Sequence, residues 1–406
     1  MKIWHPYTQE ANDLPPLEIA RGEGAYVYTR DGRSLLDAIS SWWVNLHGHA
    51  HPVIAEAIAT QAHKLEHVIF AGFTHAPAEE LAAALTRVLP ASLNHVFYSD
   101  NGSTAVEAAL KIAVQYWYNK GRAEKCRIIA LENAYHGDTI GAMSISADSP
   151  FTTAFETLRL PILRISSQQA LGRLLREQKD KIAAMIVEPL IQGAAGMITY
   201  PVEHLQRFRE LCAANEVLFI ADEVFTGFGR TGRMFACEHA GIVPDLMCLA
   251  KGLTGGFLPL AVTVCSSEIY EAFQSGDRSR AFFHGHSYSG NPLGCAAAVA
   301  SLKIFETEPV FDRINTIERV HRERLPEFRG HPAVADTRML GTVSAIELRV
   351  RDAGYLSNVR ARLYRHYIEN GILLRPLGNV VYIVPPYVIS ASDLHYVYDV
   401  IGTSLP

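Results

Sequence analysis

Short apolar runs alternate with amphipathic stretches between residues 95 and 266. Apolar residues recur every three or four positions over 103–121 and 202–216, which predicts two helices, the first opening on a Ser/Thr cap and ending near Gly121. The apolar runs predict strands at "HVFYS" (95–99), "RIIALE" (127–132), "IAAMIVEP" (182–189), "VLFIAD" (217–222), "DLMCLA" (245–250) and "LAVTVCS" (260–266). Apolar strands separated by helices are typical of an α/β fold, with a mainly parallel sheet covered on both faces.

The two ends of the chain show a different pattern. Residues 1–45 mix Pro, Gly and aromatic residues around the hairpin-like stretch "YVYTRDGRSLLD" (26–37). From about residue 300 a long helical region precedes "TVSAIEL" (342–348), "ILLRPLG" (372–378) and "VVYIVPP" (380–386). We therefore expect a large domain at 46–300 and a smaller α+β domain built from 1–45 and 301–406.

Composition narrows the function classes. The 406 residues are 49% hydrophobic and 19% charged with a net charge of −5, and no Lys/Arg cluster favours nucleic acid or a membrane surface. The start "MKIWHPYTQEANDLPP" has no apolar signal region, and no apolar run approaches the length of a membrane span. The six cysteines are scattered without a CxxC pair, as in a reducing compartment. These features predict a cytoplasmic protein.

Lys251 lies in the apolar segment "DLMCLAKGLTGG" (245–256), and Asp222 ends an earlier one, "VLFIADEV" (217–224). An amine among Leu, Ala and Gly is readily desolvated, which lowers its pKa and makes it a nucleophile toward carbonyl groups. Pyridoxal phosphate chemistry needs such a lysine, together with a carboxylate that holds the pyridinium nitrogen. An ordinary lysine just past a strand end is the alternative, and the remaining motifs favour the cofactor.

The segment "FYSDNGSTAVEAALK" (97–111) predicts a strand, a Gly-containing turn and a helix. The backbone amides of Gly102, Ser103 and Thr104 would point outward from the helix N-terminus beside two hydroxyls, an arrangement that suits a phosphate. An ordinary helix cap explains the same residues, so both interpretations stay open at this point.

The segment "AYHGDTIGAMS" (134–144) follows the strand at 127–132 and so opens at a carboxyl end, where α/β sheets bind ligands. Tyr135 could lay its ring on a planar cofactor, supported by His136 and Asp138. Core packing is the alternative for an aromatic residue at this place. Glu188 and Glu223 also stand at strand ends, where they could orient other groups.

Two further motifs resemble signatures of dinucleotide binding and of metal binding but lack features that those signatures need. "GFGRTG" (227–232) matches a dinucleotide fingerprint, but its first Gly comes several residues after the strand and no clear helix opens at its end. Arg230 within it could instead clamp a carboxylate. "HGHAH" (47–51) and "HGH" (284–286) suggest a metal, yet no cysteine or acidic ligand accompanies them at metal spacing. We therefore expect no metal site.

Aromatic residues and one late arginine are the candidates for binding substrate. "SSWW" (40–43) and Tyr7 could pack in the core or line an apolar tunnel where the smaller domain meets the larger one. Arg375 lies between apolar residues in "LLRPLG" (373–378), and a nearly buried guanidinium demands a carboxylate or phosphate partner. That partner could be internal or could be the substrate.

Together these motifs resemble the class III aminotransferases, which are pyridoxal-phosphate enzymes of fold type I. The resemblance covers nearly the whole chain, with the motifs in the family's order: "DNGSTAVEAALK", "YHGD", "EPLIQGAAG", "IADEVFTGFGRTG", "LAKGLTGG" and "GHSYSGNP". It implies that Lys251 forms the Schiff base with the cofactor, that Asp222 pairs with the pyridine nitrogen and that Tyr135 stacks on the ring. It also implies a homodimer, in which Ser287 of the other subunit joins Gly102 and Ser103 at the phosphate.

The segments "IWHPYTQ", "SSWWVNLHGHAHP", "YHGDTIGAMS" and "RPLGNVVYIVPPY" resemble most the branch of the family that converts 8-amino-7-oxononanoate to 7,8-diaminononanoate in biotin biosynthesis. That resemblance implies a substrate channel lined by Tyr7, Trp42 and Trp43. It further implies that Arg375 binds the carboxylate of the keto acid, in a pocket completed by Arg230, Tyr382 and Gly285.

One motif departs from that branch and leaves the amino donor open. This chain reads "HGHSY" (284–288) where the best-known members read "HGPTF", although Ser287 keeps a hydroxyl for the phosphate. The expected donor is S-adenosylmethionine, and lysine, which some relatives use, is the alternative. Another class III activity on ω-amino acids or diamines would share every cofactor residue, and a non-enzymatic relative is a more distant alternative.

Overall fold

A computed structural model describes residues 2–11 and 14–405. At its centre is a seven-stranded sheet in which β12 alone runs antiparallel to both its neighbours. The strand order is β4 (Leu93–Ser99), β12 (Ala261–Ser266), β11 (Leu246–Leu249), β10 (Leu218–Asp222), β7 (Ile182–Val187), β5 (Arg127–Leu131) and β6 (Leu163–Ile165). The predicted mainly parallel α/β sheet is therefore confirmed. Strand β6, a short edge strand, was not predicted.

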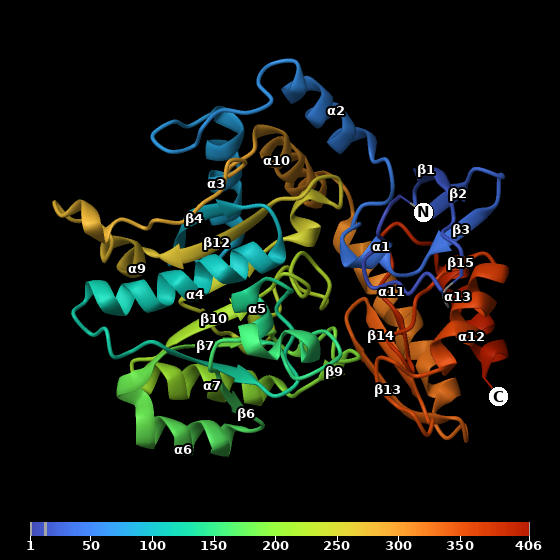
Figure 1. Cartoon of the computed structure of the whole chain (residues 1–406). Coiled ribbons are helices and arrows are strands. Elements are labelled where there is room, and N and C mark those ends of the chain that lie inside the picture. The colour runs from blue at the N-terminus through green and yellow to red at the C-terminus, as the bar shows by residue number, and fades with distance from the viewer. Residues whose placement is uncertain (1, 12–13, 406) are drawn as a thin grey trace.

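Helices cover both faces of this sheet (Figure 1). Strand β7 is buried along its whole length, with Ala184 and Ile186 in the cluster of α4 (Gly102–Asn119) and Met185 and Val187 in that of α6 (Gln168–Gln178) and α7 (Val202–Ala214). Burial on both faces explains why the strand reads as a continuous apolar run. The predicted helices 103–121 and 202–216 correspond to α4 and α7.

The two ends of the chain lie side by side, as the blue and red segments of Figure 1 show. One sheet contains β1 (Ile19–Glu23), β2 (Tyr26–Thr29) and β3 (Ser34–Asp37), and β3 pairs in parallel with β15 (Ile372–Leu373). A second, antiparallel sheet contains β13 (Val334–Leu340), β14 (Val343–Leu348) and β16 (Val380–Ile383). The helices of this region are α11 (Val310–Arg324), α12 (Val359–Glu369) and α13 (Ala391–Ser404).

The expected boundary at residue 300 falls inside α10 (Pro292–Thr307), so the division of the domains by residue number stays a prediction. Helix α10 packs against α2 (Pro52–Ala62) and α3 (Ala76–Val88). The smaller elements are α1 (Ser40–Trp43), α5 (Ile140–Ile145), α8 (Cys237–Ala240), α9 (Ser267–Glu271), β8 (Ile191–Gln192) and β9 (Ile198–Thr199). Within residues 2–11 and 14–405, none of the helices combines the length and apolar character that crossing a membrane requires.

The sheet brings the predicted cofactor residues to one edge. Strands β4, β5, β10 and β11 run in the same direction, so their carboxyl ends meet there. Gly102 follows β4, Tyr135 follows β5, Asp222 ends β10 and Lys251 follows β11. Ligands of open α/β sheets bind at this edge.

Candidate active site

A cavity of about 380 Å³ opens at the carboxyl edge of the sheet. Most of its wall is aromatic or apolar, with a few charged groups near its base, as is usual for a small-molecule site. The predicted residues that line it are Tyr7, Trp42, Trp43, Gly102, Ser103, Tyr135, Asp222 and Lys251. Residues far apart in the sequence thus meet in one hollow.

Lys251 extends into this cavity from a strained backbone position. Its φ is +48°, in the left-handed region that non-glycine residues seldom adopt outside functional sites. The Nζ atom lies 4.7 Å from the ring centroid of Trp43 and 5.8 Å from that of Phe225. Desolvation lowers the pKa of the amine from 10.5 to about 8, although Asp222 and Glu188 act in the opposite direction. About a tenth of the amine is therefore the neutral nucleophile at pH 7, far more than for an ordinary lysine.

Capture of pyridoxal phosphate by the cofactor-free protein should follow the neutral fraction of Lys251. Because the pKa is about 8, the capture rate should rise about tenfold per pH unit below that value and level off above it. A lysine at its ordinary pKa of about 10.4 would keep gaining up to about pH 10. Stopped-flow absorbance across this range measures the rate, and a tenfold rise per unit persisting above roughly pH 9 would contradict the assignment.

Asp222 is buried at the base of the cavity. Its Oδ2 lies 2.6 Å from Nδ1 of His136, and its Oδ1 accepts a hydrogen bond from the Val224 amide at 3.1 Å. The carboxylate is thus oriented from two sides. In the described part of the chain the buried Nε2 of His136 has no hydrogen-bond partner. The contact with Asp222 is therefore the only side-chain hydrogen bond of this imidazole among the described residues.

Glu188 forms a second buried carboxylate beside Asp222. It accepts hydrogen bonds from the amides of Tyr135 and Gly193, each at 3.0 Å. Burial raises the pKa of Glu188 to about 7, with the charge of Asp222 adding to the shift. Glu188 therefore fixes the loop that carries Tyr135, a positioning role that its place at a strand end had suggested.

The start of α4 offers open amides next to two close-packed glycines. Three amides were expected to point outward, those of Gly102, Ser103 and Thr104. The Thr104 amide instead donates to the side chain of the capping residue Asn101 at 3.0 Å. No acceptor among the described residues reaches the amides of Gly102 and Ser103. A Cβ at Gly137 would lie 2.0 Å from Ser103 Oγ, and one at Gly102 would lie 2.6 Å from Val224 Cγ1. The packing therefore leaves room at these two positions for glycine alone.

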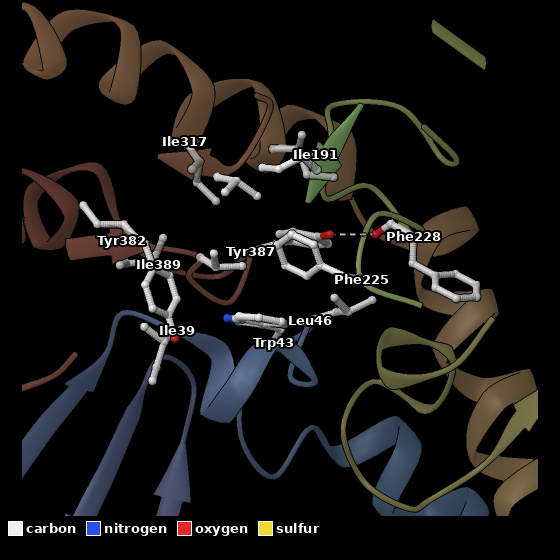
Figure 2. Packing of buried hydrophobic residues seen from close by; sticks show 14 of the residues in the cluster. Ile39, Trp43, Leu46, Ile191, Phe225, Phe228, Ile317, Tyr382, Tyr387 and Ile389 are labelled. Carbon is white, nitrogen blue, oxygen red and sulfur yellow. Dashed lines mark hydrogen bonds between the residues drawn. The ribbon is translucent and has the colours of Figure 1, made fainter. Parts of the chain in front are cut away.

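Trp42 and Trp43 come from a turn with unusual backbone geometry. All of Ser40–Trp43 has positive φ, from 46° to 75°. The left-handed conformation costs roughly 1–2 kcal/mol for each non-glycine residue, and it normally occurs at single positions. In Figure 2 Trp43 lies among Ile39, Tyr382 and Phe225, with ring centroids 4.5 Å from Phe225 and 6.0 Å from Tyr382. Trp42 contacts Tyr7 instead, at 5.1 Å between centroids.

A second cavity of about 180 Å³ adjoins the first and shares Trp42, Tyr355 and Leu377 with it. Arg375 and Tyr382 line this smaller cavity. The Arg375 guanidinium lies 5.0 Å from the ring centroid of Trp42, and Nη2 donates to the Tyr7 carbonyl at 3.1 Å. Within residues 2–11 and 14–405 no carboxylate lies within ion-pair distance of Arg375, so its charge faces the cavity without an anionic partner.

Three predicted residues lie outside the two cavities. The guanidinium of Arg230 is buried and donates to the carbonyls of Pro385, Asn45 and Trp43 at 2.8, 3.1 and 3.3 Å. These contacts turn its two Nη atoms toward the protein backbone, while its buried Nε has no partner among the described residues. Arg230 therefore lines neither cavity, which differs from the expectation that it completes the substrate pocket. Gly285 and Ser287 lie on an exposed loop of the chain, away from the cavity of the same chain.

Several lining residues are not among the predicted ones. Phe225 follows Asp222 by three positions, and its aromatic character next to a strand end was the available signal. Phe151 and Tyr355 come from loops, and their ring centroids lie 4.5 Å apart in the cavity wall. No periodicity or motif marks either of them, because their contacts depend on how the two halves of the chain meet.

The histidines of "HGHAH" have partners within the protein. His47 Nε2 lies 3.2 Å from Ser301 Oγ, His49 Nε2 lies 2.9 Å from Asp37, and His51 Nε2 lies 3.0 Å from Glu308. Across the described ranges, no group of three potential metal ligands comes together. The histidines thus anchor the segment after the tryptophan turn.

Comparison with known proteins identifies the family. The sequence profile of the class III aminotransferases matches residues 7–405. The chain belongs to the class III aminotransferase family. It is 47% identical to the adenosylmethionine-8-amino-7-oxononanoate aminotransferase of Synechococcus elongatus, over 99% of this chain and 98% of that protein. It is therefore a pyridoxal-phosphate-dependent transaminase of fold type I.

Solved structures of related enzymes share the architecture. The adenosylmethionine-8-amino-7-oxononanoate aminotransferase of Methanocaldococcus jannaschii superposes with a TM-score of 0.95 at 38% identity, covering 99% of this chain and 96% of that one. A pyridoxal-phosphate-bound amine transaminase from an uncultivated Pseudomonas species gives a TM-score of 0.93 at 30% identity, covering 100% and 98% of the two chains. The predicted family, fold class and cofactor are confirmed.

The residues of the cavity fit this cofactor. A desolvated amine, a buried carboxylate oriented by His136 and two open amides at a helix N-terminus supply the chemistry that an aldehyde, a pyridine nitrogen and a phosphate require. Gly102 and Ser103 at the helix start line the cavity, so their amides can face a ligand bound there.

Proposed function

We propose that this enzyme transfers an amino group to 8-amino-7-oxononanoate to form 7,8-diaminononanoate, with S-adenosylmethionine as donor. Relatives with up to 47% identity over nearly the full length carry names that state this substrate and this donor. The observation that carries the proposal is Arg375, whose charge faces a cavity next to the one that holds Lys251. A guanidinium without an internal anion suits a substrate that carries a carboxylate at the end of an apolar chain.

The protein's own groups would divide the chemistry as follows. When bound, pyridoxal phosphate supplies a carbonyl carbon that accepts amines and a ring that takes up the electron pair left on the substrate carbon. Lys251 would anchor the cofactor and, once displaced, carry the proton between substrate and cofactor carbons. Asp222 would keep the pyridine nitrogen protonated, and Gly102 and Ser103 would hold the phosphate. Tyr135 would cover the ring and exclude water.

The aromatic wall would accept the apolar chain of the keto acid. Tyr7, Trp42 and Trp43 lie between Lys251 and Arg375, with Trp43 near the amine and Trp42 near the guanidinium. Burial of each methylene of the substrate against such rings is worth about 0.8 kcal/mol. A long aliphatic keto acid therefore gains both from the wall and from the charge at its end.

We propose further that the enzyme is a cytoplasmic homodimer. The loop of residues 281–289 is largely exposed and holds Ser287 away from its own cavity, which supports a contribution of that hydroxyl to the partner's phosphate site. Sedimentation should give a dimer. Mixing Lys251→Ala with Ser287→Ala protomers tests the arrangement. In the mixed dimer one active site should lack both Lys251 and Ser287, whereas the other should have both. Activity should therefore recover on mixing.

Replacing Arg375 by alanine should raise the KM for 8-amino-7-oxononanoate about 10- to 100-fold, because a charge-assisted hydrogen bond contributes roughly 1.5–3 kcal/mol. Cofactor affinity and the KM for the donor should stay within about twofold, since Arg375 lies in the second cavity. Arg329→Ala is the matched control, an exposed arginine whose Nε contacts Thr337 at 3.3 Å. An unchanged KM for the keto acid would remove Arg375 from the site.

A donor assay separates the remaining candidates. The purified enzyme is incubated with 8-amino-7-oxononanoate and either S-adenosylmethionine or lysine, and the diamine product is quantified. Product with lysine alone would change the donor while keeping the acceptor. The similarity to an amine transaminase makes an ω-amino acid or diamine activity the second candidate. Turnover of simple amines without any on the keto acid would favour that alternative.

A further inference from the structure

The two tryptophans depend on a turn whose backbone is intrinsically unfavourable. Ser40, Ser41, Trp42 and Trp43 have φ values of 50°, 46°, 75° and 73°. Consecutive left-handed residues other than glycine persist only where surrounding contacts hold them. The question is therefore which groups hold this turn.

Asp37, the last residue of β3, holds the start of the turn through hydrogen bonds. Its side chain is fully buried, and its Oδ1 accepts from the Ile39 amide at 3.1 Å. Its Oδ2 accepts from the Ser41 hydroxyl at 2.8 Å and lies 2.9 Å from His49 Nε2. One carboxylate thus joins the entrance of the turn, its second residue and the segment that follows it.

His49 is itself held in place for this contact. Its Nδ1 lies 3.2 Å from the side-chain amide nitrogen of Asn45, which makes Nδ1 the acceptor and leaves the hydrogen on Nε2 to be donated to Asp37. A Cβ at Gly22 would lie 2.6 Å from His49 Cβ, so the backbone of β1 closes tightly over this side chain. A buried carboxylate needs such a donor, because an unpaired one is strongly unfavourable.

Arg230 holds the end of the turn. It donates to the carbonyls of Trp43 and Asn45 and ties both to Pro385. Ser40 donates to the Val384 carbonyl at 2.7 Å in the same direction. The turn is thus fixed between a buried carboxylate and a buried guanidinium, neither of which lines a cavity.

The geometry of the turn determines where the indole rings lie. Trp43 faces Lys251, with 4.7 Å between its ring centroid and Nζ, whereas Trp42 faces Arg375 at 5.0 Å. A right-handed turn would direct these adjacent side chains differently, because side-chain direction follows backbone conformation. We propose that Asp37, paired with His49, is a positioning residue for amino transfer: it holds the left-handed turn Ser40–Trp43 that sets one tryptophan beside the amine and the other beside the guanidinium. The inference rests on the proposed function insofar as the keto acid is the ligand that both rings contact.

Asp37→Asn tests the proposal in the holoenzyme. The amide oxygen can still accept from Ile39, but its NH₂ group cannot accept from Ser41 or His49. Because displaced indole rings would lose contacts with the keto acid, we expect its KM to rise at least roughly tenfold. The visible spectrum of the bound cofactor should be unchanged, and tryptophan fluorescence should shift. Asp393→Asn is the control, since this carboxylate accepts from Tyr26 on β2 at 2.6 Å and does not touch the turn.

A matched pair at Ser41 keeps the test decisive if Asp37→Asn fails to fold. Ser41→Ala and Ser41→Gly both lose the hydroxyl bonded to Asp37, but glycine alone adopts φ of +46° without a steric penalty. Alanine should raise the KM for the keto acid and shift the fluorescence, whereas glycine should stay near wild type in both. Equal effects of the two residues, or an unchanged KM and fluorescence in a folded Asp37→Asn protein, would overturn the proposal. A wild-type enzyme inactive on the keto acid would refute the proposed function instead, while the fluorescence comparison would still decide the role of Asp37.

Discussion

Lys251→Ala should reduce turnover by about 10⁴-fold or more, the largest effect expected for any single substitution in this protein. The amine combines roles that no neighbour can assume. It lies at the end of β11 with a pKa lowered to about 8, and the other groups near it are aromatic rings and carboxylates. None of these neighbours can bond the cofactor as an amine does.

The covalent bond proposed between Lys251 and the cofactor offers a test besides activity. Borohydride reduction should fix the cofactor to the peptide that contains Lys251, and Lys251→Ala should bind the cofactor without becoming labelled. Lys125 is the matched control, a second buried lysine whose pKa is also lowered to about 8. Its Nζ lies 3.9 Å from the ring centroid of Trp117, and it donates to the Glu216 carbonyl. Lys125 precedes β5, whereas Tyr135 of the cavity follows that strand, and Lys125 does not line the cavity. Label on Lys125, or turnover retained in Lys251→Ala, would refute the assignment.

The comparison of the two lysines also shows which part of the site could be predicted from the sequence. Desolvation alone does not distinguish Lys251 from Lys125, because burial lowers the pKa of both. The two lysines are distinguished by their positions, since Lys251 follows a parallel strand and Lys125 precedes one. Asp222 pairs in register with Cys248, so the chain order of two adjacent strands already brings the carboxylate and the lysine to one edge. Strand direction, which the apolar runs predict, was sufficient for this pair.

The aromatic wall shows where such prediction stops. Trp42 and Trp43 were recognised as candidates, but the left-handed turn that separates their directions consists of residues that rarely adopt it. The family resemblance places Arg230 at the substrate pocket, whereas in the structure its Nη1 and Nη2 donate to three backbone carbonyls. Both outcomes depend on contacts between the chain's two ends and its centre. Local patterns carry no signal for such contacts.

Asp222→Asn should lower kcat by about 10²- to 10³-fold, the range seen when one preorganised electrostatic group is removed from an active site. The substitution keeps the size of the side chain and an oxygen that can accept from the Val224 amide, a hydrogen bond of 3.1 Å in the unaltered protein. It removes the negative charge that would keep the pyridine nitrogen of the bound cofactor protonated. Because no other carboxylate is oriented by His136, the protein has no substitute for this charge among its described residues.

A second consequence separates loss of charge from general damage. Asp222 raises the pKa of Lys251 and thereby opposes its desolvation. A neutral amide at this position would no longer do so, and the pH profile of cofactor capture should move to lower pH while kcat falls. Asp245→Asn is the control on the same sheet: this carboxylate precedes β11, pairs with Arg209 at 3.0 Å and accepts from the Phe219 amide at 2.7 Å. Asp245→Asn should change the stability of the protein but neither the pH profile of cofactor capture nor kcat. If the capture profile of Asp222→Asn stays in place and kcat changes less than about tenfold, the charge at residue 222 does not act on the cofactor site.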